Sequence, residues 1–172
     1  RLQNAGEEAQ RLKQKISGLR NELYALCGRL SETRQKAARK LSEEILRELS
    51  DLGMPNAKFE ARFVPLPEQS AVEAYGKNGI DEMEFYISTN AGEPMKPLAK
   101  TASGGEISRI MLAFKNISAG ADDISTLIFD EIDTGISGKM ALVVSEKMAS
   151  IARSRQVICV THLPQIAAMA EN

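Results

Sequence analysis

The sequence predicts an α/β fold preceded by a long helical arm, and three observations carry this prediction. From Leu2 to Leu30, apolar or small residues recur with gaps of three and four in alternation, which is the spacing of a heptad repeat, and from Ala37 to Leu49 the gap is four throughout. After Gly53 and Pro55 the pattern changes to short runs that are typical of strands. Two wholly apolar runs flank a helical segment, as in a βαβ unit with a parallel sheet. We therefore divide the 172 residues into an arm, residues 1–50, and an α/β lobe, residues 51–172.

Composition excludes several classes of protein. Hydrophobic residues make up 43% of the chain and charged residues 26%, the balance of a soluble globular protein. No run approaches the roughly 18 apolar residues of a membrane span, so we expect a cytoplasmic chain without a membrane partner. The net charge of −1 gives no sign of a protein that coats nucleic acid. Cys27 and Cys159 form no CxxC pair, and a single histidine excludes a multi-histidine metal centre.

The arm is expected to form one helix of a coiled coil. Its apolar seam consists of Leu2, Ala5, Ala9, Leu12, Ile16, Leu19, Leu23, Leu26 and Leu30. No second heptad segment follows, so the partner helix would come from another molecule or from a part of the natural protein outside these residues. The alternative is a solvated helix that lies on the lobe. Late in the arm, the basic group Arg34, Lys36, Arg39 and Lys40 is either a DNA contact or, as we favour, part of a solvated helix face.

Alternating and apolar runs predict the elements of the lobe. Strands are expected near 59–63 and 83–87, as an antiparallel pair joined by a polar loop, followed by an ordered loop over 90–102. A helix over about 104–119 comes next, with Ile107, Ile110, Met111 and Phe114 on one face. The apolar strands 126–129 and 157–160 are expected to be buried on both faces, with a helix over about 138–152 between them.

The first of three short motifs is Ala102-Ser103-Gly104-Gly105-Glu106, at the start of a predicted helix. Ser103 and Glu106 have the spacing of a capping box. That reading leaves the two glycines unexplained, since glycine weakens the first turn of a helix. Paired glycines expose backbone N–H groups to an anion at the positive end of the helix dipole. Capping and phosphate binding both stay open.

The other two motifs follow the two apolar strands. Asp130-Glu131 suits Mg²⁺ held by the first acid and a water molecule oriented or deprotonated by the second; two solvent-facing acids are the alternative. Thr161-His162 follows the second strand. Because the carboxyl ends of parallel strands meet at one edge, His162 should lie on the edge of Asp130 and Glu131, although a lone histidine is more often structural.

In this order, the three motifs resemble the ATPase head of the ABC/SMC superfamily: signature motif, Walker B strand with its catalytic Glu, D-loop and switch His. Residues 99–115, 126–138 and 157–168 resemble one branch of it, a family of bacterial DNA repair proteins, and this likeness is dense from about Pro94 to Ala168. Common transporter signatures read Leu-Ser-Gly-Gly-Gln, whereas Ala102 and Glu106 favour the repair family. The resemblance implies an ABC-ATPase head lobe, a P-loop NTPase-like sheet with flanking helices, preceded by a coiled-coil helix.

The resemblance also implies which residues meet the nucleotide. The signature motif, here Ser103, Gly104, Gly105 and Glu106, would bind the γ-phosphate of an ATP held mainly by a second copy of the head.

Four further roles follow from the same resemblance. Asp130 would act on Mg²⁺, and Glu131 would polarise the attacking water. Asp133 would belong to the loop that communicates across the head dimer, and His162 would contact the γ-phosphate. ATP and Mg²⁺ are therefore the expected cofactors.

A P-loop is missing from the sequence. The motif needs Gly, four residues, then Gly-Lys and Ser or Thr, but the Gly-Lys pairs at 76–77 and 138–139 are followed by Asn78 and Met140. We therefore expect a C-terminal fragment that is inactive alone and is completed by the N-terminal half of the same protein. The parent would be a nucleoid-associated SMC-like ATPase that contacts DNA in recombinational repair of double-strand breaks. Another SMC-like chromosome-organising ATPase and a catalytically inactive coiled-coil adaptor are the alternatives.

Overall fold

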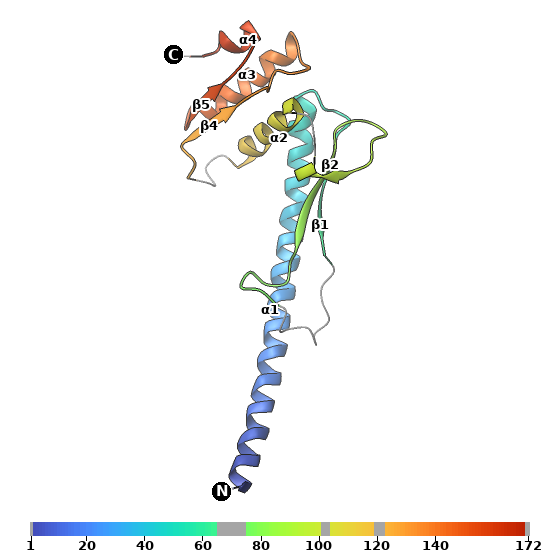
Figure 1. Cartoon of the computed structure of the whole chain (residues 1–172), viewed down its shortest axis with the longest axis vertical. Helices are drawn as coiled ribbons and strands as arrows, with labels where there is room; N and C mark the ends of the chain where they lie inside the picture. Colours follow the sequence, from blue (N-terminus) through green and yellow to red (C-terminus); the bar gives the residue numbers. More distant parts are fainter. Residues whose placement is uncertain (1, 65–74, 101–103, 119–122, 171–172) are drawn as a thin grey trace. The chain divides into compact units, whose positions relative to one another are not determined.

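The computed structural model describes residues 2–64, 75–100, 104–118 and 123–170 (Figure 1). The elements in chain order are α1 (Leu2–Asp51), β1 (Lys58–Phe63), β2 (Met83–Ser88), β3 (Lys96–Pro97), the 3₁₀ helix η2 (Leu98–Lys100), α2 (Gly104–Ile117), β4 (Thr126–Phe129), α3 (Lys139–Ala152), β5 (Gln156–Cys159) and α4 (Pro164–Ala167). Two compact units form, Arg1–Arg39 with Arg62–Glu84 and Lys40–Ala61 with Phe85–Asn172, and each is described by itself. The predicted division at residue 50 stays a prediction.

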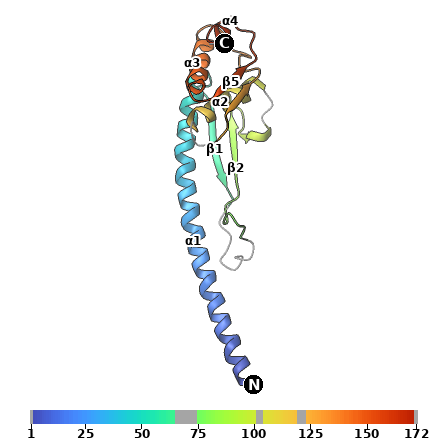
Figure 2. The same cartoon turned by 90° about the vertical axis from the view of Figure 1, so that its left-hand side faces the viewer.

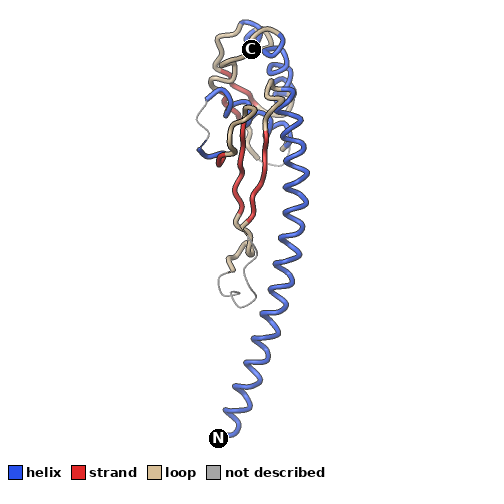
Figure 3. Tube along the Cα trace, turned by 90° about the vertical axis from the view of Figure 1, so that its right-hand side faces the viewer, coloured by secondary structure: helices blue, strands red, loops and turns tan. Residues whose placement is uncertain are grey.

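Helix α1 confirms the long helix predicted from the heptad spacing, and it is one uninterrupted helix in Figure 3. It ends where the glycine signal predicts, because Gly53 adopts the left-handed φ of 82° that L side chains avoid. The Gly53 N–H donates to Ser50 O at 3.2 Å and the Met54 N–H to Leu49 O at 2.8 Å. This pair of bonds is the Schellman motif, which satisfies carbonyls that the end of a helix leaves open.

In the first unit, the predicted seam of α1 is exposed to solvent. The large seam side chains from Leu12 to Leu30 are each between 41% and 59% exposed. Such an apolar row on one helix face is typical of a coiled-coil helix seen without its partner.

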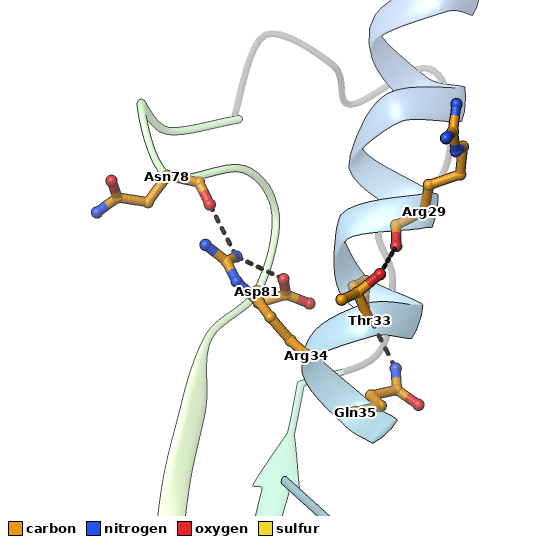
Figure 4. A network of polar contacts seen from close by, with 7 residues as sticks. Arg29, Thr33, Arg34, Gln35, Asn78 and Asp81 are labelled. Atoms are coloured by element: carbon orange, nitrogen blue, oxygen red, sulfur yellow. Dashed lines mark hydrogen bonds and ion pairs between the residues drawn. The ribbon is translucent and has the colours of Figure 1, made fainter. Parts of the chain in front are cut away.

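A polar latch holds the loop before β2 against α1 within this first unit. Arg34 Nη1 donates to Asn78 O at 2.8 Å and lies 2.6 Å from Asp81 Oδ2, as Figure 4 shows. Gly79 suits the turn of this loop, because its φ of 91° is one that L side chains rarely adopt. Arg34 is thus engaged with an acid of its own unit, which weakens the reading of the basic group as a DNA contact.

The three-stranded sheet has the order β1-β2-β3, and β1 and β2 lie side by side in Figure 2. Strand β3 pairs antiparallel with β2 through Tyr86 and Pro97. The predicted ordered loop over 90–102 therefore contains a short strand and a 3₁₀ turn. In the second unit, Phe59, Phe85 and Phe114 pack together with ring centroids 5.2 to 5.7 Å apart. Among the described residues, this aromatic cluster joins an otherwise mostly aliphatic core.

The βαβ unit confirms the predicted parallel sheet. Strands β4 and β5 pair in parallel, with Phe129 opposite Cys159, and α3 connects them. Burial on both faces was the wrong expectation, because burial alternates: Leu127 is buried, whereas Ile128 and its partner Ile158 are 69% and 44% exposed. Helix α3 packs against β5, and the exposed side chains of Ile128 and Ile158 lie opposite each other on one face of the sheet.

Helix α2 confirms part of the predicted face, since Ile110 is fully buried and Phe114 packs against the core. Arg109, Ile110, Leu112 and Ala113 are buried, whereas Met111 is exposed. No helix in the described part of the chain is long and apolar enough to cross a membrane.

Candidate functional site

The first turn of α2 packs against the turn that follows β4. A Cβ atom at Gly104 would overlap the carboxylate of Glu131, and one at Gly105 would lie 2.8 Å from Thr134 Cβ and 3.0 Å from Glu131 O. The two glycines thus have a packing reason in addition to any anion they bind. Ser103 lies outside the described residues, so its capping and phosphate roles stay predictions.

Glu131 adopts a left-handed backbone conformation, with φ of 56°, and no other non-glycine residue in the described part of the chain has a positive φ. A non-glycine residue in this region costs on the order of 1 to 3 kcal/mol and persists where its surroundings enforce it. Here the Thr134 N–H donates to Glu131 O at 3.0 Å, closing the turn. Such strain clusters at functional sites, which makes Glu131 a functional candidate on structural grounds.

The side chains of Asp130 and Glu131 are both exposed at the end of β4. No three His, Cys, Asp or Glu side chains gather into a metal cluster within the described ranges. Mg²⁺ commonly takes one or two protein carboxylates and fills its remaining positions with water and phosphate oxygens. The isolated acid pair therefore fits a magnesium ion delivered with a nucleotide and does not fit a resident structural metal.

The Asp133 carboxylate ties this turn to the segment after β5. Its Oδ2 accepts hydrogen bonds from Thr161 Oγ1 at 2.6 Å, from the His162 N–H at 2.7 Å and from the Leu163 N–H at 3.2 Å. Burial alone would raise the pKa of Asp133, but these hydrogen bonds, with one from its own backbone, hold the pKa below its ordinary value. Asp133 is therefore ionised and holds both segments in one arrangement.

His162 lies at the edge of the sheet where the strand register predicts it. Its side chain is exposed, and its main chain is held by Asp133. Burial raises the pKa of the neighbouring Cys159 thiol, and the negative charges of Asp133 and Asp130 at this edge raise it further. A cation or a nucleotide-bound metal suits this edge better than a free anion.

Two further residues of α2, which lie outside the three sequence motifs, hold the turn that follows β4. Ser108 Oγ donates to Asp130 O at 2.6 Å. Arg109 Nη1 donates to Thr134 O at 2.8 Å and to Ile132 O at 3.3 Å. The sequence carries no signal for these contacts, because a single arginine in an amphipathic helix has the pattern of a surface residue.

Glu106 is engaged with the segment after β2. Its Oε2 accepts a hydrogen bond from Thr89 Oγ1 at 3.1 Å, and Thr89 is buried. A glutamine carbonyl could accept the same hydrogen bond, so this contact fixes Glu106 in place without explaining why it differs from the glutamine of common transporter signatures.

The fold belongs to a known class, the SMC head with its coiled coil. The Smc head domain with an extended coiled coil from Pyrococcus furiosus matches 81% of this chain and 31% of its own, with a TM-score of 0.51 and 20% identity. The Smc head with a coiled coil and joint from Pyrococcus yayanosii matches 81% and 24%, with a TM-score of 0.52 and 20% identity.

Sequence comparison finds relatives with higher identity than these structures have. Over 96% of its length the chain is 44% identical to the DNA repair protein RecN of Halalkalibacterium halodurans, and over 99% it is 40% identical to RecN of Bacillus subtilis. The chain is therefore similar to RecN proteins over nearly its whole length. It spans 29% and 31% of the length of these two relatives. No family model matches the chain.

Proposed function

We propose that this chain is the part of an SMC-like ATPase that supplies the signature motif, Walker B strand, D-loop and switch histidine, and that the parent protein acts in recombinational repair of DNA double-strand breaks. The observation that carries the proposal is the packing of the signature turn at Gly104 and Gly105 against the Glu131 turn. Kinship with DNA repair proteins named RecN supports the biological setting.

Hydrolysis would be metal-assisted attack of water on the γ-phosphate of ATP. Asp130 would hold Mg²⁺ directly or through water, and Glu131 would orient and polarise the attacking water. His162 would donate to the γ-phosphate, while Ser103 and the glycines after it would bind the phosphate of an ATP carried by a second head. Mg²⁺ supplies charge neutralisation for the phosphates when bound.

The partners follow from what the sequence lacks. Because no P-loop is present in these 172 residues, the N-terminal half of the parent would hold most of the nucleotide, and two heads would enclose it. The exposed seam of α1 would pair with a second helix of the parent, which carries head closure to bound DNA. We place the parent in the cytoplasm, with the nucleoid.

The test is ATP hydrolysis by this chain mixed with a separately expressed N-terminal half, compared with each alone. We expect turnover only in the mixture, and its loss with Glu131→Gln while ATP binding remains. Glu146→Gln, the same loss of charge at an exposed position on α3, is the matched control and should keep full turnover. Association without turnover would contradict the proposal and favour a coiled-coil adaptor that has lost catalysis.

A further inference from the structure

The Arg109 guanidinium is buried, which costs hydration free energy. Its residue is only 7% exposed, and its Nε has no hydrogen-bond partner within the described part of the chain. A buried cation loses several kcal/mol of hydration, which hydrogen bonds must offset. Burial accordingly lowers the pKa of Arg109, and the negative charge of Glu106 opposes that shift.

Arg109 donates hydrogen bonds to main-chain carbonyls of one turn. The acceptors, Ile132 O and Thr134 O, lie on either side of Asp133, one and three residues after Glu131. Packing also restricts this turn. Gly105 lies so close to it that a Cβ atom on the glycine would be 3.0 Å from both Glu131 O and Thr134 O. Two carbonyls pointed at one cation fix the orientation of the peptide planes between them.

Glu131 is the residue whose geometry depends most on that turn. Its φ of 56° is less stable than an ordinary helical or extended conformation, so it needs outside contacts to persist. If the 132–134 carbonyls were released, the turn could relax, and the Cα–Cβ direction of Glu131 would change with it. A carboxylate that orients an attacking water tolerates little displacement, because about 1 Å of misplacement costs roughly a hundredfold in rate.

We propose that Arg109 is a positioning residue for ATP hydrolysis. From helix α2 it holds the turn of residues 131–134, so that the Glu131 carboxylate keeps its direction toward the attacking water. This inference rests on the proposed function. It adds a link from the signature motif to the catalytic glutamate within one head. Through Asp133, the same turn also holds the main chain of His162.

The test uses the full-length parent protein and measures single-turnover ATP hydrolysis, ATP affinity and the thermal unfolding midpoint. We expect Arg109→Met to lower the hydrolysis rate by about tenfold or more and to leave ATP affinity within about threefold, since the change is in orientation and not in binding. Arg109→Lys should recover part of the rate, because an ammonium can donate to one of the two carbonyls. Lys147→Met is the control: it also removes a largely buried cation with two partners on another element, and it should keep the rate.

A double-mutant cycle separates positioning from general stability. In a Glu131→Gln background, Arg109→Met should change the residual hydrolysis less than about twofold, since the group it positions is gone. An equal loss in both backgrounds, or a loss of ATP affinity, would overturn the inference. If Arg109→Met does not fold, the same cycle with Arg109→Lys decides, and a Lys variant that hydrolyses like the wild type would then overturn it. Absence of any Glu131-dependent hydrolysis in the wild type would instead refute the proposed function, and the inference with it.

Discussion

Gly105 and Thr134 meet so closely that a Cβ atom on the glycine would lie 2.8 Å from the Cβ of the threonine. Real Cβ atoms do not approach this closely, and both groups are anchored, one in α2 and the other in the turn held by Arg109. The neighbouring Gly104 differs, because the atom its Cβ would meet is the end of the flexible Glu131 side chain. The two glycines should therefore respond differently to the same substitution.

Gly105→Ala should lower the free energy of unfolding by about 1 to 3 kcal/mol, the usual range for overpacking. Gly104→Ala, its matched control, should be close to neutral, because the Glu131 carboxylate can move and alanine gains up to about 1 kcal/mol of helix propensity over glycine. Urea unfolding of the chain without nucleotide measures both. Equal effects would mean that the turn moves as easily as the carboxylate does.

Asp133→Asn should make stability less dependent on acid. Because the pKa of Asp133 is lowered in the folded chain, its contribution is present above the unfolded pKa of about 3.9 and is lost as the pH falls through the lower folded value. At pH 7 the variant should be less stable by about 1 to 3 kcal/mol, since charged hydrogen bonds become neutral ones. Urea unfolding at pH 7 and at several values below 4 measures the difference. A parallel decline of both proteins with acid would contradict the assignment.

Lys147→Met should remove an alkaline dependence of stability. Lys147 Nζ lies 2.8 Å from Glu48 Oε2 and 2.9 Å from Asp51 Oδ2. Burial would lower the pKa of Lys147, but these two carboxylates raise it overall, so its contribution is present below the unfolded value and is lost as the pH rises above about 10.5. The variant should be less stable at pH 7 by about 1 to 2 kcal/mol, and this gap should close as the pH rises through the raised pKa of Lys147. Chemical unfolding across that range tests it, and a constant gap would speak against the ion pairs.

The Arg34–Asp81 pair should show measurable coupling in the first unit. Arg34 is 37% exposed and Asp81 only 7%, so solvent screens the pair in part. A double-mutant cycle with alanine at both positions should give a coupling of about 0.5 to 1 kcal/mol that shrinks in 1 M salt. Lys36→Ala combined with Asp81→Ala, which removes an exposed cation on the same helix, should be additive. Additivity in both cycles would mean that the Arg34–Asp81 pair contributes nothing to the free energy of unfolding.

Much of the fold could be predicted because the strongest signals are local. The heptad spacing and Gly53 give the extent of α1, and the apolar runs give β4 and β5 with their parallel pairing. Strand β3 escaped prediction because it has two residues and one of them is Pro97. The burial of Ile128 and Ile158 was mispredicted since an apolar run describes the side chains and carries no information on what covers them.

The candidate site was predictable in its outline and not in its supports. Strand register alone placed Asp130, Glu131 and His162 at one edge of the sheet. The contacts of Arg109 and the three hydrogen bonds to Asp133 depend on how α2 packs beside that edge, which no spacing encodes. A single arginine in an amphipathic helix looks like a surface residue until the packing is known.

The exposed apolar side chains of the βαβ sheet affect how these 172 residues behave when they are produced alone. Ile128, Ile158 and Val160 are 69%, 44% and 52% exposed, and among the described residues β4 and β5 form a two-stranded sheet in which both strands are edges. A short apolar strand with an open edge is a template for intermolecular pairing. We expect the isolated segment to aggregate at high concentration, and replacing Ile128 with threonine to improve its solubility while keeping the strand.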